Sequence, residues 1–230
     1  MRSSRGDGMI NAVIFDLDGT LLDTIGDLAD AVNHTFAAYG REARTEAQVK
    51  RNVGRGIRNL IAQSLSLGRD DPDYEAIFRD FKSYYTVNCR NRTAPYPGID
   101  EMLVMLKDAG LATAVVSNKN DEAARGLVSY FFGDLIDVCA GATENVKPKP
   151  DPGMIRSAME RIGAAPSETV YVGDQEVDFE SAENAGLPLI AAGWGFRGEK
   201  TLMEFARKTG RKKPAVARRP EDIAELILGR

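Results

Sequence analysis

The sequence predicts an α/β fold in which a doubly wound parallel sheet carries an inserted block of helices. Two observations support this prediction. From Gly98 onward, apolar runs of strand length alternate with stretches of helical periodicity, which is typical of repeated strand–helix units. Between Asp27 and Arg92, by contrast, only helical periodicity is present. We therefore expect a separate helical unit to interrupt the sheet after its first strand.

The first strand is an unbroken apolar run, Ala12 to Phe15, that ends in two carboxylates, a glycine and a hydroxyl. Such a run suits a strand that is covered on both faces, as in a parallel sheet. Residues two apart in an extended chain point the same way, so Asp16 and Asp18 can face one pocket. Gly19 permits a sharp turn directly after them, and Thr20 offers a hydroxyl close by.

Three stretches with apolar residues at helical spacing follow, and two of them end at glycines, Gly40 and Gly68. Proline- and glycine-containing segments border this part of the chain, as expected for linkers. We predict an inserted helical domain over residues 24–92 and a core domain formed by residues 9–23 and 93–230.

The core resumes with four further predicted strands, each followed by a helical stretch; they cover residues 111–116, 136–140, 169–172 and 187–192. The basic segment 207–219 is interpreted as a solvated helix end and loop, because the chain as a whole is acidic. Ile223, Leu226 and Ile227 then predict a terminal helix that docks back onto the core.

Composition excludes several classes of function. The net charge of −4 and the pI near 5.3 argue against general binding of nucleic acid or anionic membranes. Only two cysteines are present, which provides no disulfide framework and fits a reducing cytoplasm. No apolar run reaches the roughly 20 residues that span a bilayer. Residues 1–8 resemble a disordered leader.

Polar side chains follow several predicted strands, and the carboxyl ends of parallel strands meet at one edge of the sheet. We expect these side chains to converge with Asp16, Asp18 and Thr20 in one pocket; they are Ser117, Asn118, Lys147, Asp174 and Asp178. Carboxylate oxygens without histidine or cysteine form a ligand field for a hard cation, and Mg²⁺ is the usual choice beside phosphate.

This set of residues favours phosphoryl transfer. Asp16 would attack phosphorus and form an aspartyl-phosphate intermediate. Asp18 would protonate the leaving oxygen and later take a proton from water. Mg²⁺ and Lys147 would reduce the repulsion between carboxylate and phosphoryl group, while Thr20, Ser117 and Asn118 would hold phosphoryl oxygens.

Four segments in order resemble the motifs of the haloacid dehalogenase superfamily, and the resemblance covers essentially residues 9–227; the segments are 15–21, 116–119, 147–152 and 172–178. The resemblance implies a Rossmann-like core with a C1 cap and Mg²⁺-dependent hydrolysis of phosphomonoesters. It assigns the metal to Asp16, the backbone carbonyl of Asp18 and Asp174. It places Asp178 behind these ligands, close to Lys147, and it favours Lys147 over Lys149 as the site lysine.

Within that superfamily, residues 21–28 and 52–56 look most like phosphoglycolate phosphatases. This implies 2-phosphoglycolate as substrate, with Arg55 as a candidate contact to its carboxylate. Gln175 departs from the small hydroxyl residue of many relatives and puts substrate fit in doubt.

Several alternatives stay open at this point. The substrate could be another small phosphorylated metabolite, such as a nucleotide, a sugar phosphate or pyrophosphate. A phosphomutase of the β-phosphoglucomutase type would share Asp16 and Asp18, but those relatives carry a histidine in the first cap turn, and residues 27–31 contain none. A regulatory protein without catalysis is a further class. We expect a cytoplasmic monomer or homodimer that binds neither nucleic acid nor membrane.

Overall fold

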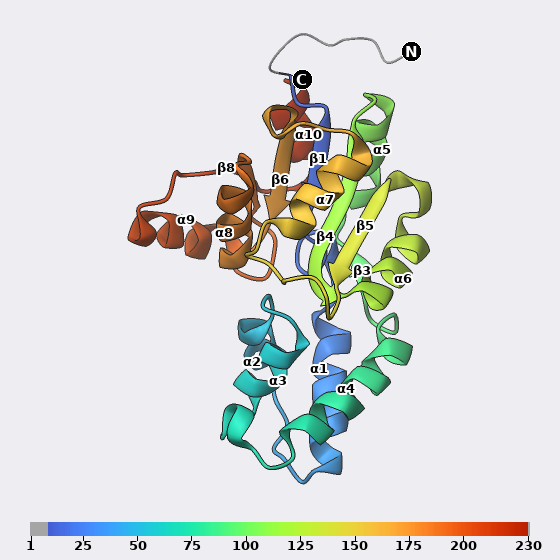
Figure 1. The fold of residues 1–230 in the computed structure, drawn as a ribbon, viewed down its shortest axis with the longest axis vertical. Coiled ribbons are helices and arrows are strands. Elements are labelled where there is room, and N and C mark those ends of the chain that lie inside the picture. Colours follow the sequence, from blue (N-terminus) through green and yellow to red (C-terminus); the bar gives the residue numbers. More distant parts are fainter. Residues whose placement is uncertain (1–8, 230) are drawn as a thin grey trace.

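The computed structural model describes residues 9–229, so the predicted leader at residues 1–8 lies outside the described part of the chain. Within that part, six parallel strands form one sheet in the order β5–β4–β1–β6–β7–β8 (Figure 1). They are β1 (Ala12–Phe15), β4 (Ala112–Asn120), β5 (Val138–Ala142), β6 (Thr169–Gly173), β7 (Leu189–Ala192) and β8 (Ala215–Ala217). The predicted doubly wound parallel sheet is confirmed.

Helices cover both faces of this sheet, which explains why β1 is apolar at every position. Val13 and Phe15 pack on one face, with the core helices α5 (Ile99–Asp108), α6 (Asp121–Phe131) and α10 (Pro220–Leu228). Ala12 and Ile14 pack on the other face, with α7 (Gly153–Ile162) and α8 (Glu176–Ala185). Since alternate residues of a strand point to opposite faces, a strand buried on both sides has no polar position.

The C-terminal part of the chain adds structure that the sequence did not predict. Residues Ala215–Ala217 form β8, which pairs in parallel with β7, within the segment interpreted as a loop. Before it, α9 (Gly198–Thr209) packs through Leu202 and Ala206 against β7. The predicted terminal helix is α10, and its Ile223 is fully buried.

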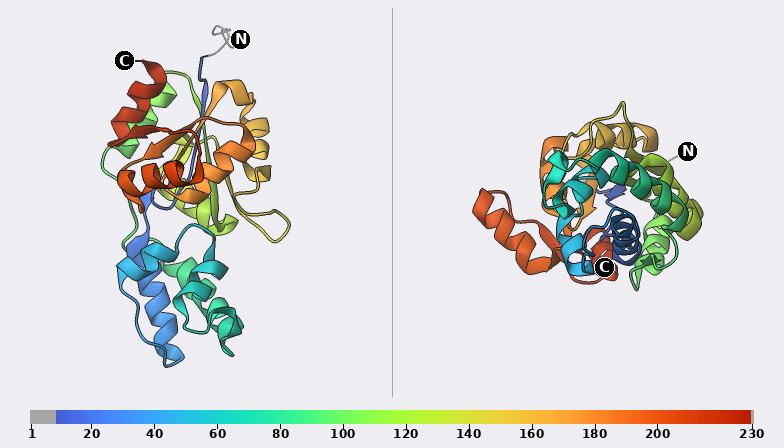
Figure 2. Two further views of the ribbon diagram at one scale, coloured as in Figure 1. Left: turned by 90° about the vertical axis from the view of Figure 1, so that its left-hand side faces the viewer. Right: turned by 90° about the horizontal axis from the view of Figure 1, so that it is seen from below.

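A second group of helices lies beyond the carboxyl ends of the strands and away from α10 (Figures 1 and 2). It consists of α1 (Ile25–Ala38), α2 (Glu46–Asn52), α3 (Ile57–Ser64) and α4 (Tyr74–Asn88), with a short 3₁₀ turn at 68–70 between α3 and α4. Two further 3₁₀ turns lie outside this group, at 133–135 and 166–168. We call residues 24–92 the helical block. Its interior is apolar and includes Phe36, Ile61 and Phe81, each fully buried.

The two connections between the helical block and the sheet run side by side. They pair as a short antiparallel ladder of β2 (Leu22–Asp23) and β3 (Ala94–Pro95). Asp27 in the first turn of α1 is buried and accepts hydrogen bonds from the backbone N–H groups of Arg92 and Thr93, both at 2.9 Å, and from the Thr93 hydroxyl at 2.7 Å. These bonds fix the outgoing connection to the start of the block.

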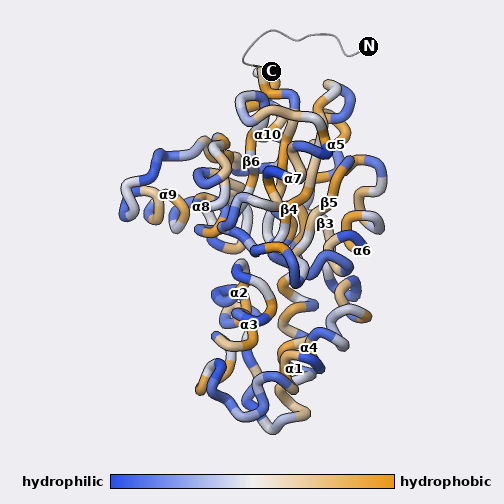
Figure 3. The backbone as a smooth tube through the Cα atoms, in the orientation of Figure 1, coloured by the Kyte–Doolittle hydropathy of each residue, from blue (hydrophilic) through white to orange (hydrophobic). Residues whose placement is uncertain are grey.

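Hydropathy follows the layers of the fold. Apolar residues concentrate along the strands of the sheet, whereas polar residues dominate the loops and outer helices (Figure 3). Within residues 9–229, none of the helices combines the length and the apolar character that crossing a bilayer requires.

Candidate active site

The end of β1 presents the two carboxylates of Asp16 and Asp18. The N–H of Asp16 still donates to the Val172 carbonyl at 2.9 Å, so Asp16 is held by the sheet. The chain then turns sharply at Gly19, whose φ is 93°. A Cβ at Gly19 would lie 2.5 Å from Oδ2 of Asp174, so only glycine allows this approach.

Three carboxylates meet at this edge of the sheet. Asp16, Asp174 and Asp178 are buried, and each offers an oxygen within 4.8 Å of the others. Asp178 is the most fully bonded of the three: its Oδ2 accepts from the backbone N–H groups of Asp174 and Gln175 at 3.1 and 3.0 Å. Asp174 accepts from the Thr20 hydroxyl at 3.0 Å and from the N–H of Phe196 at 2.7 Å. The predicted convergence of these carboxylates is therefore present.

The lysine at this site is Lys149, and the prediction of Lys147 is wrong. Lys149 Nζ lies 2.8 Å from Oδ1 of Asp16 and 2.9 Å from Oδ1 of Asp178, and its side chain is 1% exposed. Lys147 is exposed on the loop that precedes α7. The loop is fixed at Lys149 because the Lys149 N–H donates to the Asn118 side chain at 2.7 Å and the Lys149 carbonyl accepts from it at 3.1 Å. Tyr171 also accepts from Lys149 Nζ, at 2.9 Å.

One lysine does not balance the negative charge of this cluster. Burial raises the pKa of Asp16 to about 7; Lys149 opposes this shift, and Asp178 and Asp18 reinforce it. The pKa of Asp174 is raised well above its ordinary value, first by burial and then by Asp178 and Asp16. A divalent cation would relieve both effects. The donor set of buried carboxylate oxygens suits Mg²⁺, so the residues fit the metal that the resemblance implies.

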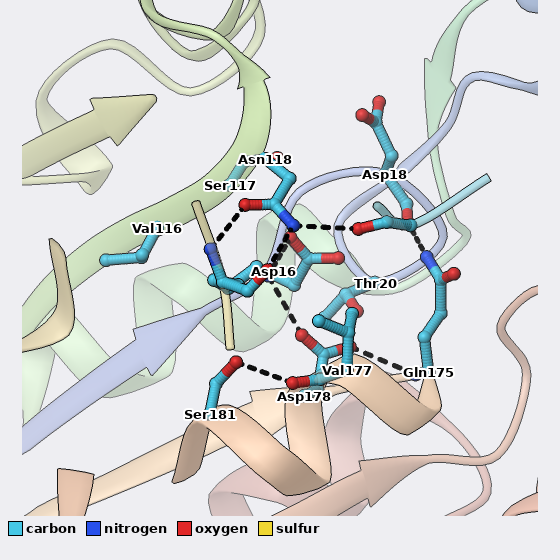
Figure 4. A network of polar contacts seen from close by, with 12 residues as sticks. Asp16, Asp18, Thr20, Val116, Ser117, Asn118, Gln175, Val177, Asp178 and Ser181 are labelled. Atoms are coloured by element: carbon cyan, nitrogen blue, oxygen red, sulfur yellow. Dashed lines mark hydrogen bonds and ion pairs between the residues drawn. The ribbon is translucent and has the colours of Figure 1, made fainter. Parts of the chain in front are cut away.

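The three predicted phosphate contacts differ in what they do in the structure. Ser117 is buried and lines the cavity beside Asp16. Asn118 also lines the cavity, but its amide bonds the backbone of Lys149 and donates to the carbonyl of Gly54 in the helical block at 2.9 Å. The Thr20 hydroxyl donates to Asp174, so Thr20 positions a carboxylate. Figure 4 shows Asp16 between Ser117 and Asp178.

Arg55 does not line the cavity beside Asp16. Its guanidinium pairs with Glu180 of α8 at 3.1 Å, and half of its side chain is exposed. Arg197, which the sequence did not single out, makes the larger contact between core and helical block. It donates to the carbonyls of Lys50, Arg51 and Val53 at 2.8, 3.1 and 3.2 Å, and so satisfies the C-terminal end of α2.

Asp18 faces a second lysine that the sequence reasoning missed. Lys119 Nζ lies 2.9 and 3.2 Å from the two carboxylate oxygens of Asp18 and 2.6 Å from the hydroxyl of Tyr85 in α4. The Asp18 carboxylate points away from Asp178, as Figure 4 shows. The signal for Lys119 was its spacing: it lies two residues after Ser117, and β4 runs through both. The predicted strand ends at residue 116, before Lys119.

A cavity of about 40 Å³ lies between the sheet edge and the helical block. The core contributes a polar wall that includes Asp16, Asp18, Ser117 and Lys119. The helical block contributes an apolar wall of Leu28, Val53, Ile57 and Leu60, together with Tyr85. Gln175 lies between the two walls and donates to the backbone carbonyl of Asp18 at 3.4 Å. A small molecule in this cavity would contact both carboxylates at the end of β1.

Comparisons with known proteins show the family to which the chain belongs. The family model described as haloacid dehalogenase-like hydrolase matches residues 13–192. The chain is 33% identical to a phosphoglycolate phosphatase of Mesorhizobium japonicum, over 84% of this chain and 86% of the relative. It is also 33% identical to an N-acetylmuramic acid 6-phosphate phosphatase of Pseudomonas aeruginosa, over 81% of this chain and 83% of the relative.

A solved structure from Lactobacillus delbrueckii subsp. bulgaricus, provisionally named a phosphoglycolate phosphatase, superposes with a TM-score of 0.88. It is 30% identical and is matched over 96% of this chain and all of its own. The family resemblance carried by the four motifs is thereby confirmed. The chain belongs to the haloacid dehalogenase-like hydrolase family.

Proposed function

We propose that this protein is a Mg²⁺-dependent phosphatase that hydrolyses small phosphomonoesters through an aspartyl-phosphate at Asp16, with 2-phosphoglycolate as its preferred substrate. One observation carries the proposal: Asp16 and Asp18 line the same cavity, and each is bonded to its own buried lysine. The names of the relatives support the reaction class.

The reaction follows from the residues in place. A carboxylate oxygen of Asp16 attacks phosphorus, and the bond to the leaving oxygen breaks while Asp18 supplies a proton to that oxygen. Asp18 then takes a proton from a water molecule that attacks the aspartyl-phosphate and releases inorganic phosphate. Lys149 reduces the negative charge around Asp16, and Ser117 can donate to a phosphoryl oxygen.

Asp16, Asp174 and the backbone carbonyl of Asp18 would hold Mg²⁺, with Asp178 behind them. When bound, the cation would neutralise charge on the phosphoryl oxygens. From the described residues the Asp18 carbonyl accepts one long bond, from Gln175 at 3.4 Å, which is compatible with a further role as ligand. Asp178 is fixed by Lys149 and by two backbone N–H groups, which suits a residue that orients the others.

We further propose that residues 24–92 act as a cap that closes over the substrate, while residues 9–23 and 93–230 form the core. The paired connections at β2 and β3 and the contacts of Arg197 with α2 support this division. Residues of both parts of the chain line the cavity, so a substrate bound beside Asp16 would lie against the helical block. A cytoplasmic location and a monomeric or homodimeric state remain predictions from the sequence.

A phosphate-release screen tests the proposal. The panel contains 2-phosphoglycolate, N-acetylmuramic acid 6-phosphate, a nucleoside monophosphate, a hexose phosphate and pyrophosphate, each with Mg²⁺ and with chelator. We expect 2-phosphoglycolate to exceed the others at least about tenfold in kcat/KM, equivalent to about 1.4 kcal/mol, and chelator to abolish turnover. A higher kcat/KM for another substrate would contradict the assignment of 2-phosphoglycolate as the preferred substrate. Release of phosphate from none of them would contradict the reaction class.

A further inference from the structure

Lys119 and Tyr85 form a buried polar pair on opposite walls of the cavity. Lys119 lies on β4 of the core, and Tyr85 lies on α4 of the helical block. Both are at least 95% buried, and their Nζ and hydroxyl oxygen are 2.6 Å apart. An ammonium offers three donors. Lys119 donates to both carboxylate oxygens of Asp18 and to the Tyr85 hydroxyl, whereas the hydroxyl of Tyr85 donates to no acceptor among the described residues, so the pair keeps one free donor.

Within residues 9–229, the other side chains that line the cavity provide no further positive charge. Among the described residues that line it, Lys119 is the one cationic side chain. The arginine expected to meet a substrate carboxylate, Arg55, pairs with Glu180 elsewhere. The helical block otherwise contributes apolar side chains. An anionic group on the leaving side of the substrate therefore has one cation to bind.

The distances fit a short leaving group. Asp18 must lie within hydrogen-bond distance, about 3 Å, of the leaving oxygen in order to protonate it. Lys119 Nζ lies 2.9 Å from the same carboxylate. A carboxylate one carbon beyond the leaving oxygen would therefore be within reach of this ammonium. A substrate carboxylate at this position would meet the Lys119 ammonium and the Tyr85 hydroxyl together, because these two groups are 2.6 Å apart.

We propose that Lys119 and Tyr85 recognise a carboxylate on the leaving group and so make this site specific for short phosphorylated hydroxy acids. This inference rests on the proposed phosphatase function. In this proposal Lys119, at the end of β4, and Tyr85, from the helical block, together bind the anionic group of the substrate. Lys119 transfers no proton in this account; it binds the part of the substrate that does not react.

Three substrates of similar size separate the roles of these residues. 2-Phosphoglycolate carries a carboxylate, ethyl phosphate has the same chain length without it, and acetyl phosphate has a leaving group that needs no protonation. The ratio of kcat/KM for 2-phosphoglycolate over ethyl phosphate reports carboxylate recognition. The ratio for ethyl phosphate over acetyl phosphate reports proton donation by Asp18. We would measure both ratios for the wild type, Lys119→Met and Tyr85→Phe, with Mg²⁺.

We expect Lys119→Met to lower the first ratio on the order of 100-fold, the typical cost of losing a hydrogen bond to a charged group in a buried site. Tyr85→Phe removes only a hydroxyl and should lower the first ratio about fivefold. Lys107→Met is the matched control, because Lys107 pairs with Asp137 at 2.6 Å on the exposed side of the core. Its first ratio should equal that of the wild type.

An unchanged first ratio in Lys119→Met overturns the proposal. If the second ratio then falls, Lys119 acts through Asp18; if neither ratio moves, Lys119 serves the fold. Should Lys119→Met fail to fold, an unchanged first ratio in Tyr85→Phe overturns the proposal instead. The wild type separates this inference from the reaction class: equal turnover of 2-phosphoglycolate and ethyl phosphate contradicts the inference alone, whereas turnover of none of the three contradicts the phosphatase function.

Discussion

Replacing Lys149 by methionine should both destabilise the protein and nearly abolish its activity. Lys149 Nζ lies 2.8 Å from Asp16 and 2.9 Å from Asp178. At an effective dielectric constant near 20, a pair at that distance attracts by about 6 kcal/mol before the cost of desolvation is subtracted. Breaking such a buried pair by removing one partner typically costs about 3–5 kcal/mol. We expect a loss of that size in the free energy of unfolding.

The effect on catalysis should be of similar size. Without Lys149, no ammonium neutralises the negative charge of Asp178 beside the nucleophile Asp16. An approaching phosphoryl dianion is then repelled more strongly. We expect kcat/KM for phosphate release to fall on the order of 10³-fold, equivalent to about 4 kcal/mol. Lys147→Met is the matched control. It changes an exposed lysine two residues away and should alter stability by less than about 0.5 kcal/mol.

The assay is phosphate release at saturating Mg²⁺, with far-UV circular dichroism at the same temperature to show that each variant is folded. Urea unfolding gives the free energies. The reasoning is refuted if Lys147→Met loses activity while a folded Lys149→Met keeps it, because the loop would then be in the other register. Wild-type activity in both variants would refute a catalytic role for either lysine.

Three further predictions concern the connections, the metal and the closure of the helical block. Asp27→Ala should cost about 3 kcal/mol in urea unfolding, because it leaves the Arg92 N–H and the buried N–H and hydroxyl of Thr93 without their acceptor. A loss below about 1 kcal/mol would show that these groups find other partners. In the metal-free protein, the raised pKa of Asp16 means that the folded state binds more protons than the unfolded state between about pH 4 and 7. The melting temperature should therefore fall as pH rises through that range. Mg²⁺ should raise the melting temperature more at pH 8 than at pH 5.5. Asp16→Asn should flatten this dependence, and an unchanged slope would assign it to other groups. Arg197→Met should speed proteolytic cleavage around residues 46–56, since three carbonyls lose their donor, while an unchanged rate would show that Arg197 does not hold the block.

The sequence carried enough information for the sheet because its strands are buried on both faces. The run at residues 12–15 is apolar throughout, and the run at residues 169–172 has Thr169 as its one hydroxyl residue without an aromatic ring. β8 was missed for the opposite reason. It consists of three small apolar residues, Ala215–Ala217, within a basic segment, and only its pairing with β7 makes it a strand.

The site was predictable as far as strand ends determine it. Asp16, Ser117 and Asp174 follow apolar runs directly, so the sheet brings them together. Lys149 lies in a loop in which Lys-Pro occurs twice in succession, and periodicity cannot show which of the two lysines is buried. The contact between Asn118 and the backbone of Lys149 decides it, and that contact joins segments 31 residues apart.

Tyr85 shows a second limit of sequence patterns. Tyr85 lies on the same face of α4 as Ile77 and Phe81, and all three residues are buried. Sequence periodicity indicates the helix face on which a side chain lies, but it does not identify the residue that its polar end contacts. The hydroxyl of Tyr85 meets Lys119 only because the block lies against the sheet edge.

The central claim is that Asp16 becomes covalently phosphorylated, and acid quenching during turnover tests it most directly. The enzyme is mixed with substrate labelled at phosphorus in the presence of Mg²⁺, stopped in acid within milliseconds, and digested. The account predicts labelled phosphate on the peptide that contains Asp16, released by mild base, and its absence in Asp16→Asn together with loss of turnover. Rapid turnover with no labelled peptide, or full activity of Asp16→Asn, would contradict it.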